Sequence, residues 1–398
     1  MAAVAFGLAA PALAADAPEW RAVDEATGQI RDVEGLEQLA LDFPNSGTVR
    51  LRLLQPLLAA GEAERIMELL EWLYDRGYVF SDVAQAQIPK LLAGVDPGRI
   101  AERLRAEAEV IEASEAIATV PAETGLIETV VSPDVGILVV TSITQQAGFA
   151  SMDGTDWQRL EMPMANDLSG LVADTERNIG WFASSNIDQS EVDGARFNGL
   201  IGLSNGSDQP ILVPAPEGVT LSDLELGFDG AVYASDPLNG GVYVARPNST
   251  ELEVLVAPGT LRSPQGLAVG EYGNLLYVSD YRYGIAIVDL ADGSVSRLAS
   301  DIPIILDGVD GLWRYGHELI AVQNGTSPMR ISAFELSKDG TRITGHRILE
   351  QTHSDWTEPL SGSIDGDALI YIGNGQWDRY IEGCLLYTSD AADDVSIV

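Results

Sequence analysis

Six short apolar runs, each ending in a small polar cluster, recur along the last two-thirds of the chain. They are ILVVTS (Ile137–Ser142), IGWFASSN (Ile179–Asn186), AVYASD (Ala231–Asp236), LLYVSD (Leu275–Asp280), ELIAVQN (Glu318–Asn324) and ALIYIGN (Ala368–Asn374). Their starts lie 42, 52, 44, 43 and 50 residues apart. β-Branched and aromatic runs that return with a period in the forties, with Gly, Asp and Asn turns between them, are typical of propeller blades. The pattern predicts an all-β, six-bladed β-propeller over residues 124–383, with an axial funnel where chemistry would sit.

The region before the repeats has a different period. Residues 22–118 carry apolar side chains at helical spacing, as in the segment GEAERIMELLEWLYDRGY, where Ile66, Leu70 and Leu73 share one face. Pro121-Ala122-Glu123-Thr124-Gly125 marks the boundary with the propeller. The sequence therefore predicts a small N-terminal α-helical module that packs on the propeller. The alternative is a module that docks a protein partner.

Charge excludes several classes of partner. The chain has 60 Asp and Glu residues against 23 Lys and Arg, a net charge of −37. Nucleic acids and anionic membrane surfaces both require clustered cations. We therefore expect a small-molecule substrate, no nucleic-acid partner and no membrane association.

The two ends of the sequence carry segments that are not expected to belong to the folded domains. Residues 1–14 form a small-residue apolar stretch ending in Ala12-Leu13-Ala14, as in a signal peptide, but no basic residue precedes it. This predicts a periplasmic or secreted protein; the alternative is an unprocessed Ala-rich arm. The segment CLLYTSDAADD resembles a translated transposase sequencing adapter, so residues 384–398 are predicted to be a non-native tail. The only cysteine, Cys384, lies in that tail.

When the six repeats are aligned, one position is polar in all of them, and we call this set of residues the polar column. Upstream of each apolar run lies a segment that would form the strand nearest the axis, and one register position in these segments is always polar. The column consists of Glu128, Ser169, Asp223, Gln265, Asp307 and Ser361, and a glycine follows four of its members. Glycine lets backbones approach closely, as they must near the axis of a propeller. We expect the column to line the mouth of the central channel.

Three carboxylates converging in one funnel repel each other unless a cation lies among them. The acids Glu128, Asp223 and Asp307, together with the amide oxygen of Gln265, form an all-oxygen set. Such donors suit Ca²⁺ best, and Mg²⁺, Mn²⁺ or Zn²⁺ are possible. None of the three histidines falls in the column, so a His-rich zinc site is not expected. The alternative to a metal site is that the polar column only lines a water-filled channel.

The segments SPQGLAV, LLYVSD, GIAIVDL and LDGVDGLW resemble the gluconolactonase/regucalcin (senescence marker protein) group of six-bladed propellers. The resemblance implies an axial divalent metal held by Glu128, Gln265 and Asp307, with Asp307 also acting as the catalytic base. It implies hydrolysis of a lactone or ester at that metal. The chain departs from the group's pattern where Gln265 replaces an asparagine, and where Thr220-Leu221-Ser222 lacks a substrate-binding arginine.

The leading hypothesis is thus a metal-dependent hydrolase of the lactonase or esterase type, with Asp223, Ser169 and Ser361 contacting the substrate. Asp307→Asn is expected to abolish turnover and to leave metal-free melting almost unchanged. The alternative is a non-catalytic propeller that binds a ligand or a protein in the periplasm.

Overall fold

A computed structural model describes residues 17–92, 97–104, 107–187, 196–204, 209–377, 380–381, 384–385 and 395–397. The predicted signal peptide, residues 1–14, lies outside this set. None of the helices in the described part of the chain has the length and apolarity needed to cross a membrane.

The N-terminal part is helical, and its helices begin where the sequence offers capping side chains. Ser46 accepts a hydrogen bond from the Val49 N–H, and Ser81 accepts one from the Ala84 N–H. The helices are α1 Glu25–Gly28, α2 Val33–Asp42, α3 Gly47–Ala60, α4 Ala63–Tyr74, α5 Asp82–Leu91 and α6 Pro97–Leu104.

The rest of the chain forms sheets in which neighbouring strands are antiparallel, apart from one parallel pair in the fifth blade. The first three blades contain β2 Ile127–Asp134, β3 Ile137–Ser142, β4 Ala147–Ser151 and β5 Trp157–Leu160; β6 Asp167–Asp174, β7 Ile179–Ser185, β8 Gly199–Ser204 and β9 Ile211–Pro214; and β10 Leu224–Leu226, β11 Val232–Asp236, β12 Gly241–Ala245 and β13 Glu253–Val256.

The next two blades are also complete, and a two-stranded sheet follows them. These strands are β14 Pro264–Val269, β15 Leu275–Asp280, β16 Gly284–Asp289 and β17 Val295–Arg297; β18 Ala299–Ser300, β19 Leu312–Tyr315, β20 Glu318–Gln323, β21 Arg330–Leu336 and β22 Arg342–Gln351; and β23 Gly362–Asp365 with β24 Ala368–Tyr371. Each of the six apolar runs in the sequence forms the second strand of its sheet.

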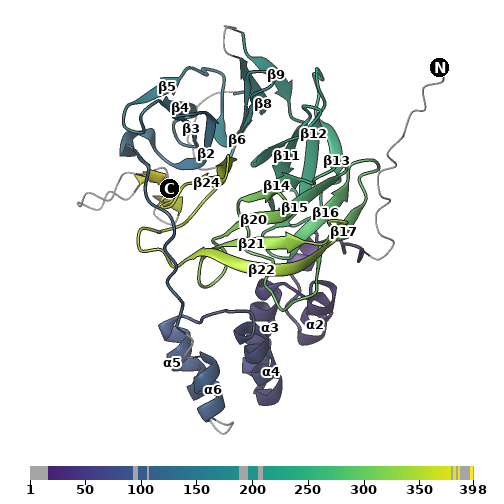
Figure 1. Cartoon of the computed structure of the whole chain (residues 1–398). Helices are drawn as coiled ribbons and strands as arrows, with labels where there is room; N and C mark the ends of the chain where they lie inside the picture. The colour runs from purple at the N-terminus through teal and green to yellow at the C-terminus, as the bar shows by residue number, and fades with distance from the viewer. Residues whose placement is uncertain are drawn as a thin grey trace, which may run out of the picture.

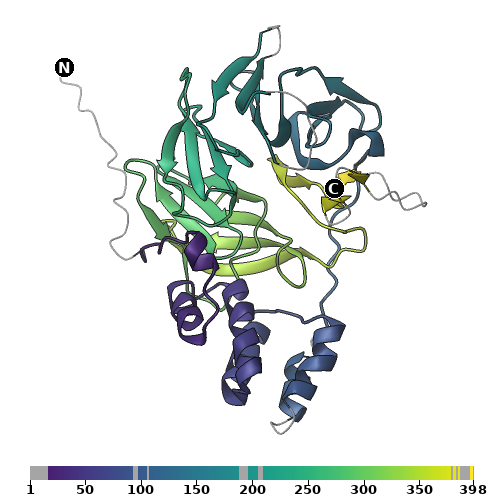
Figure 2. The same ribbon diagram turned by 180° about the vertical axis from the view of Figure 1, so that it is seen from behind.

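The innermost strands close into a ring. β2 contacts β6, β6 contacts β10, β10 contacts β14, β14 contacts β19, β19 contacts β23, and β23 contacts β2. Figure 1 shows the blades arranged around this ring, and in Figure 2 the yellow hairpin β23–β24 lies between the fifth blade and the first. The prediction of an all-β propeller with an N-terminal helical module is confirmed. Five blades have four or five strands, and the sixth position holds two.

Short strands near the chain's end lie beside the first blade. β1 (Ala118–Val120) pairs antiparallel with β27 (Val395–Ile397), and Ile397 is buried. β25 (Tyr380–Ile381) pairs with β26 (Cys384–Leu385). The interpretation of residues 384–398 as a non-native tail stays a prediction.

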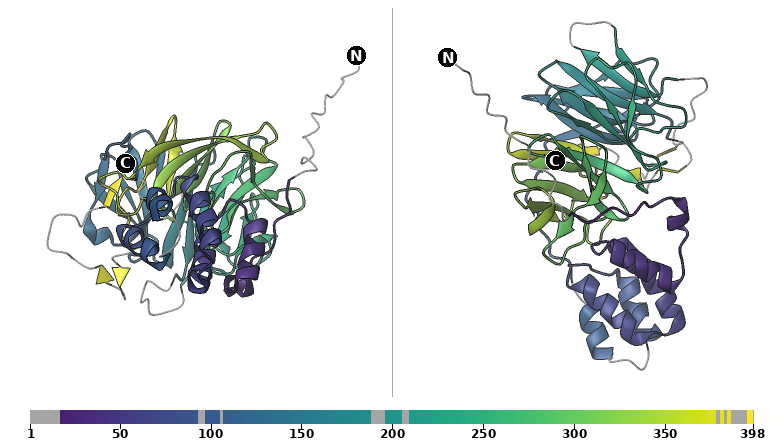
Figure 3. Two further views of the ribbon diagram at one scale, coloured as in Figure 1. Left: turned by 90° about the horizontal axis from the view of Figure 1, so that it is seen from below. Right: turned by 90° about the vertical axis from the view of Figure 1, so that its right-hand side faces the viewer.

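The helical module packs on one side of the ring, beside the fourth and fifth blades (Figure 3). The ring of Phe43 lies with its centroid 4.7 Å from that of Tyr283, in the fourth blade. Arg52 donates a hydrogen bond of 3.1 Å to the Tyr283 hydroxyl. Further along, the Val79 N–H donates to the Ser327 carbonyl in the fifth blade, over 2.9 Å. The module thus shares a continuous core with the propeller.

The segment between α6 and β1 is tied down by one buried carboxylate. Glu350, only 3% exposed, accepts hydrogen bonds from the N–H groups of Ala113 and Ser114 and from the Ser114 hydroxyl. Its other oxygen accepts a 2.6 Å bond from Tyr371 in the sixth position. Glu350 therefore joins the segment to the last two sheets of the ring.

Replacing this carboxylate tests that connection. Glu350→Ala leaves two N–H groups and a buried tyrosine hydroxyl without their acceptor, so we expect a loss of about 1–3 kcal/mol in the free energy of unfolding. Denaturant unfolding measures it. Glu115→Ala, at an exposed position of the same segment, is the control and should change little. Equal stability of the two variants would contradict the assignment.

Candidate functional site

The inner strands carry an extra residue at one level near the axis. The pairing of β2 with β3 shifts between Ile127 and Val130, and equivalent shifts occur in β6 and β14. Such bulges turn a side chain away from the regular alternation. The residues at these shifts include Glu128, Ser169 and Gln265, three members of the predicted column.

Glycines follow several of these bulges because neighbouring blades meet there. The Gly170 N–H donates to the Ser222 carbonyl over 3.0 Å, and a Cβ at Gly170 would lie 2.2 Å from that oxygen. The Gly266 N–H likewise donates to the Asp310 carbonyl over 2.8 Å. The close backbone approach expected from the sequence is confirmed at both glycines.

At the fifth position the column is filled by Asp310 and not by Asp307. The Asp310 N–H donates to the Val322 carbonyl, and the Val322 N–H donates to the Gly311 carbonyl, which are the contacts of an inner strand with its second strand. The sequence LDGVDG contains two Asp-Gly pairs three residues apart, and the alignment used the first. The prediction that Asp307 lies in the axial column is therefore wrong.

Asp307 instead holds the helical module. Its carboxylate accepts hydrogen bonds of 2.7 Å from the N–H groups of Gly47 and Thr48, and one of 3.2 Å from the Ser46 hydroxyl. These are the first residues of α3, where unpaired N–H groups favour an anion. Burial raises the pKa of Asp307, and the hydrogen bonds oppose that rise. The side chain is 2% exposed.

Four buried or partly buried carboxyls near the axis influence each other electrostatically, and we call them the axial acid group: Glu128, Asp223, Asp310 and Glu358. Burial raises the pKa of Glu128 well above its ordinary value, and the charges of Asp310 and Asp223 raise it further. Burial, followed by the charge of Glu358, raises the pKa of Asp310 to about 7. Burial and the charge of Asp310 raise the pKa of Asp223. The pKa values of Glu128, Asp223 and Asp310 thus depend on one another or on Glu358.

Two members of the axial acid group, Glu128 and Asp310, accept hydrogen bonds from side chains outside the inner strands. The Trp377 indole N–H donates to Glu128 Oε2. The Asn324 amide nitrogen donates a hydrogen bond of 3.1 Å to Asp310 Oδ2. The amide oxygen of Asn324 accepts a hydrogen bond of 2.9 Å from the Tyr281 hydroxyl. Glu358 lies outside the strand register and comes from the loop before β23, which explains why repeat alignment missed it.

The uncharged members of the column are placed differently. Ser169, 1% exposed, donates to the backbone carbonyls of Leu221 and Ser222 over 3.3 and 3.2 Å. Its hydroxyl therefore joins two blades. Gln265 directs its amide toward the Ser263 hydroxyl at 3.4 Å. Ser361 lines the axial channel, as does Asp223. Of the three residues predicted to contact substrate, these two line a cavity.

The axial channel is a cavity of about 330 Å³ walled by inner strands from every blade. Its polar lining consists of Thr129, Ser132, Thr175, Asp223, Glu225, Ser361 and Ser363. The exposed Thr175 belongs to the turn between β6 and β7, so the channel opens at the ends of the propeller formed by the turns between first and second strands. We call this end the hairpin face.

Glu225 is a second channel carboxyl that the sequence reasoning missed. Burial raises its pKa to about 7, and it accepts a 2.9 Å hydrogen bond from the Val269 N–H. It lies two residues after Asp223, and alternation along a strand places residues i and i+2 on one face. That spacing was the signal that could have identified it.

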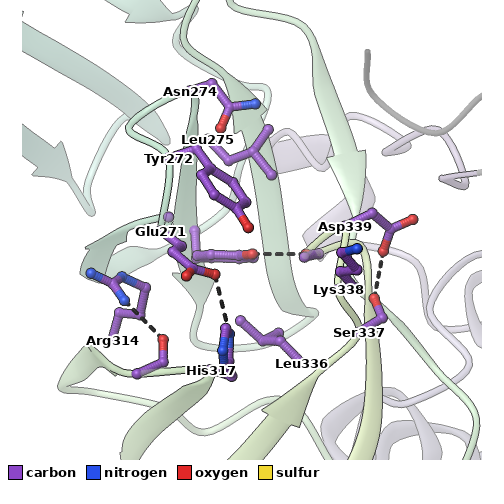
Figure 4. A pocket seen from close by; sticks show the side chains of 14 residues that line it. Glu271, Tyr272, Asn274, Leu275, Arg314, His317, Leu336, Ser337, Lys338 and Asp339 are labelled. Carbon is purple, nitrogen blue, oxygen red and sulfur yellow. Dashed lines mark hydrogen bonds and ion pairs between the residues drawn. The ribbon is translucent and has the colours of Figure 1, made fainter. Parts of the chain in front are cut away.

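A smaller pocket lies between the fourth and fifth blades (Figure 4). Its volume is about 30 Å³. Three of the charged groups in it already have partners: His317 Nδ1 lies 3.1 Å from Glu271, and Arg314 donates to the Gly316 carbonyl over 2.8 Å. The Tyr277 hydroxyl donates to the Gly340 carbonyl. This pocket therefore has less room for a ligand than the channel.

The axial acid group does not form a finished metal site. Within the described part of the chain, no three or more His, Cys, Asp or Glu side chains are placed to hold a metal ion together. The type of donor does fit a hard cation, since carboxylate oxygens are the ligands that Ca²⁺ and Mg²⁺ prefer and these carboxyls repel each other.

No protein-family model matches the chain, and no curated protein sequence does. Solved structures share the fold distantly. Virginiamycin B lyase from Staphylococcus aureus is 12% identical, with a TM-score of 0.48, over 69% of this chain and 84% of that one. The calcium-binding protein regucalcin from Agrobacterium tumefaciens is 14% identical (TM-score 0.44; 65% and 85% covered). A gluconolactonase from Xanthomonas campestris is 15% identical (TM-score 0.45; 73% and 97% covered). The chain has a distant structural similarity to these propellers, and the similarity concerns the fold alone.

Proposed function

We propose that the chain binds a divalent cation at the axial acid group and acts as a hydrolase of the lactonase or esterase type in the axial channel. The observation that carries the proposal is the burial and mutual repulsion of Glu128, Asp223 and Asp310, which raise the pKa of each.

Burying like charges together costs free energy unless an opposite charge compensates them. The charges that act most strongly on Glu128, Asp223 and Asp310 are all those of other carboxyls. A hard divalent cation, with Ca²⁺ the best fit and Mg²⁺ next, would supply the missing charge. Glu128, Asp223 and Asp310 would hold it, with the amide oxygen of Gln265 at the same level of the ring.

A bound cation would polarise an ester carbonyl and lower the pKa of a water molecule. The chain's own residues divide the remaining work. Asp223 belongs both to the acid group and to the channel wall, so it is the residue suited to accept a proton from water. Ser361 lines the same channel and offers a hydroxyl to the substrate. Asp307, which binds α3, takes no part.

Cation binding is tested by titrating chelator-treated protein with Ca²⁺ in a calorimeter. We expect one tight site, and we expect Glu128→Gln to weaken it by about tenfold or more, because one charged ligand is lost. Glu123→Gln, at an exposed position nearby, is the matched control. Absence of binding in the unmodified protein would overturn the proposal.

A second candidate, a propeller that binds a ligand without catalysis, is favoured by one observation. Ser169 and Asp307, two of the predicted site residues, are engaged in holding blades and helices together. A panel of lactones and esters, assayed with and without chelator, separates the two candidates. Chelator-sensitive turnover supports the hydrolase. Cation binding without turnover of any of them supports the binding protein.

A further inference from the structure

The wall of the axial channel has a charge pattern of its own. Asp223 and Glu225 project from one inner strand region at alternate positions, and no basic side chain is among the lining residues. The chain as a whole carries a net charge of −37. Anionic ligands are therefore repelled at a distance, whereas cations are attracted. The one basic group whose charge acts on Glu225 is Arg314, which lies outside the channel lining.

A buried hydroxyl points to a ligand independently of the acids. Thr129 lines the channel and is 2% exposed, and its Oγ1 has no hydrogen-bond partner among the residues described. Buried polar atoms in proteins are nearly always satisfied, so an exception calls for an explanation. The Oγ1 itself is buried, so a polar group of a ligand in the channel would provide the missing partner once the Thr129 side chain rotates toward it.

The remaining wall is apolar and includes one indole. Trp313, half-buried, lines the channel together with the aliphatic side chains of Leu171 and Leu267. The face of an indole attracts organic cations more strongly than other side-chain rings do. A carboxylate pair, an indole and an aliphatic wall match a ligand with a positive head and an apolar body.

We propose that the axial channel binds a small organic ammonium ion, which enters from the hairpin face and places its charge beside Glu225 and Asp223. The cavity volume of about 330 Å³ is at the small end of ligand pockets, as a compact amine requires. The exposed Thr175 stands at the mouth, and the depression bordered by Phe228 adjoins it. Asp223 also belongs to the axial acid group, so a divalent cation bound there would compete with the ammonium charge, and the site is tested with the acid group free of metal.

Choline and 3,3-dimethylbutan-1-ol are the probes, because they share a shape and differ in charge. Calorimetry in chelator and about 150 mM sodium chloride, where screening suppresses long-range attraction, measures both. We expect choline to bind and the neutral alcohol to bind at least about tenfold more weakly. Equal affinities, or no choline binding at millimolar concentration, would overturn the proposal.

Variants locate the site. Glu225→Gln keeps an acceptor for the Val269 N–H and removes the charge, so choline affinity should fall by about tenfold. Glu251→Gln, at an exposed position before β13 and outside the channel lining, should leave it unchanged. Thr175→Trp, at the exposed mouth, should obstruct entry and weaken binding without disturbing the core. Unchanged affinity in both Glu225→Gln and Thr175→Trp would contradict the assignment. Because chelator is present throughout, failure of the cation proposal would leave this result standing.

Discussion

Asp307→Asn is expected to destabilise the protein and to leave Ca²⁺ binding intact. Asp310→Asn is expected to weaken Ca²⁺ binding at least about tenfold and to leave the cation-free protein at least as stable. The two aspartates lie three residues apart and are each followed by glycine. They differ in what surrounds them, so the same substitution has opposite consequences.

At position 307 the carboxylate accepts two N–H groups and a hydroxyl from the start of α3. An asparagine retains one oxygen and turns its amide donors toward N–H groups that are themselves donors. Loss of a buried cap and of the favourable charge at the helix N-terminus should lower the free energy of unfolding by about 2–4 kcal/mol. The buried Arg330, which carries the opposite charge nearby, also loses its partner charge.

At position 310 the carboxyl lies among like charges, and its pKa is already raised to about 7. Asparagine removes one repelling charge and can still meet Asn324, so the cation-free fold does not lose stability. The cation loses a ligand from the centre of the acid group, and we expect the affinity to fall by at least about tenfold. This reverses the sequence-based expectation that Asp307→Asn would leave melting unchanged.

Thermal melting in chelator and calorimetric Ca²⁺ titration, run on both variants and on the unmodified protein, provide the comparison. Asp301→Asn, an exposed acid in the same loop region, controls for the loss of a surface charge. Loss of Ca²⁺ binding in Asp307→Asn with normal melting would show that Asp307, and not Asp310, belongs to the axial site.

The fold follows from the sequence because each blade repeats the same local chemistry. An apolar second strand must be buried on both faces, and runs such as LLYVSD can satisfy that only between neighbouring sheets. The glycines at 170 and 266 mark the level at which blades touch, and this too is local. The propeller and the shared level of Glu128, Ser169 and Gln265 were therefore predictable.

The site was less predictable because it depends on one-residue register and on loops. Two Asp-Gly pairs in LDGVDG fit the repeat equally well, and only the pairing of Asp310 with Val322 decides between them. Glu358 and Trp377 reach the axis from loops outside the repeat, so no alignment could place them. The role of Asp307 depends on α3, more than 250 residues earlier in the chain.

The second large effect is an unusual dependence of stability on pH. In chelator, the melting temperature is expected to fall as pH rises from 6 to 8. The pKa values of Glu225 and Asp310 are both about 7 in the folded protein, against ordinary values of 4.5 and 3.8. Between those limits the folded state holds protons that the unfolded chain has released, so raising the pH favours unfolding.

The stabilisation is complete below pH 4 for these two groups and is lost as pH passes through 7. We expect the melting temperature to fall by roughly 2–4 °C for each kcal/mol lost from the free energy of unfolding. Scanning calorimetry at a series of pH values measures this fall. Glu225→Gln should reduce the slope, and Glu253→Gln, at an exposed position, should not. Saturating Ca²⁺ should flatten the slope further, because a bound cation replaces the proton on Asp310. A melting temperature that rises from pH 6 to pH 8 in chelator would show that the axial carboxyls are ionised at little cost, and the electrostatic basis of the proposed cation site would then be lost.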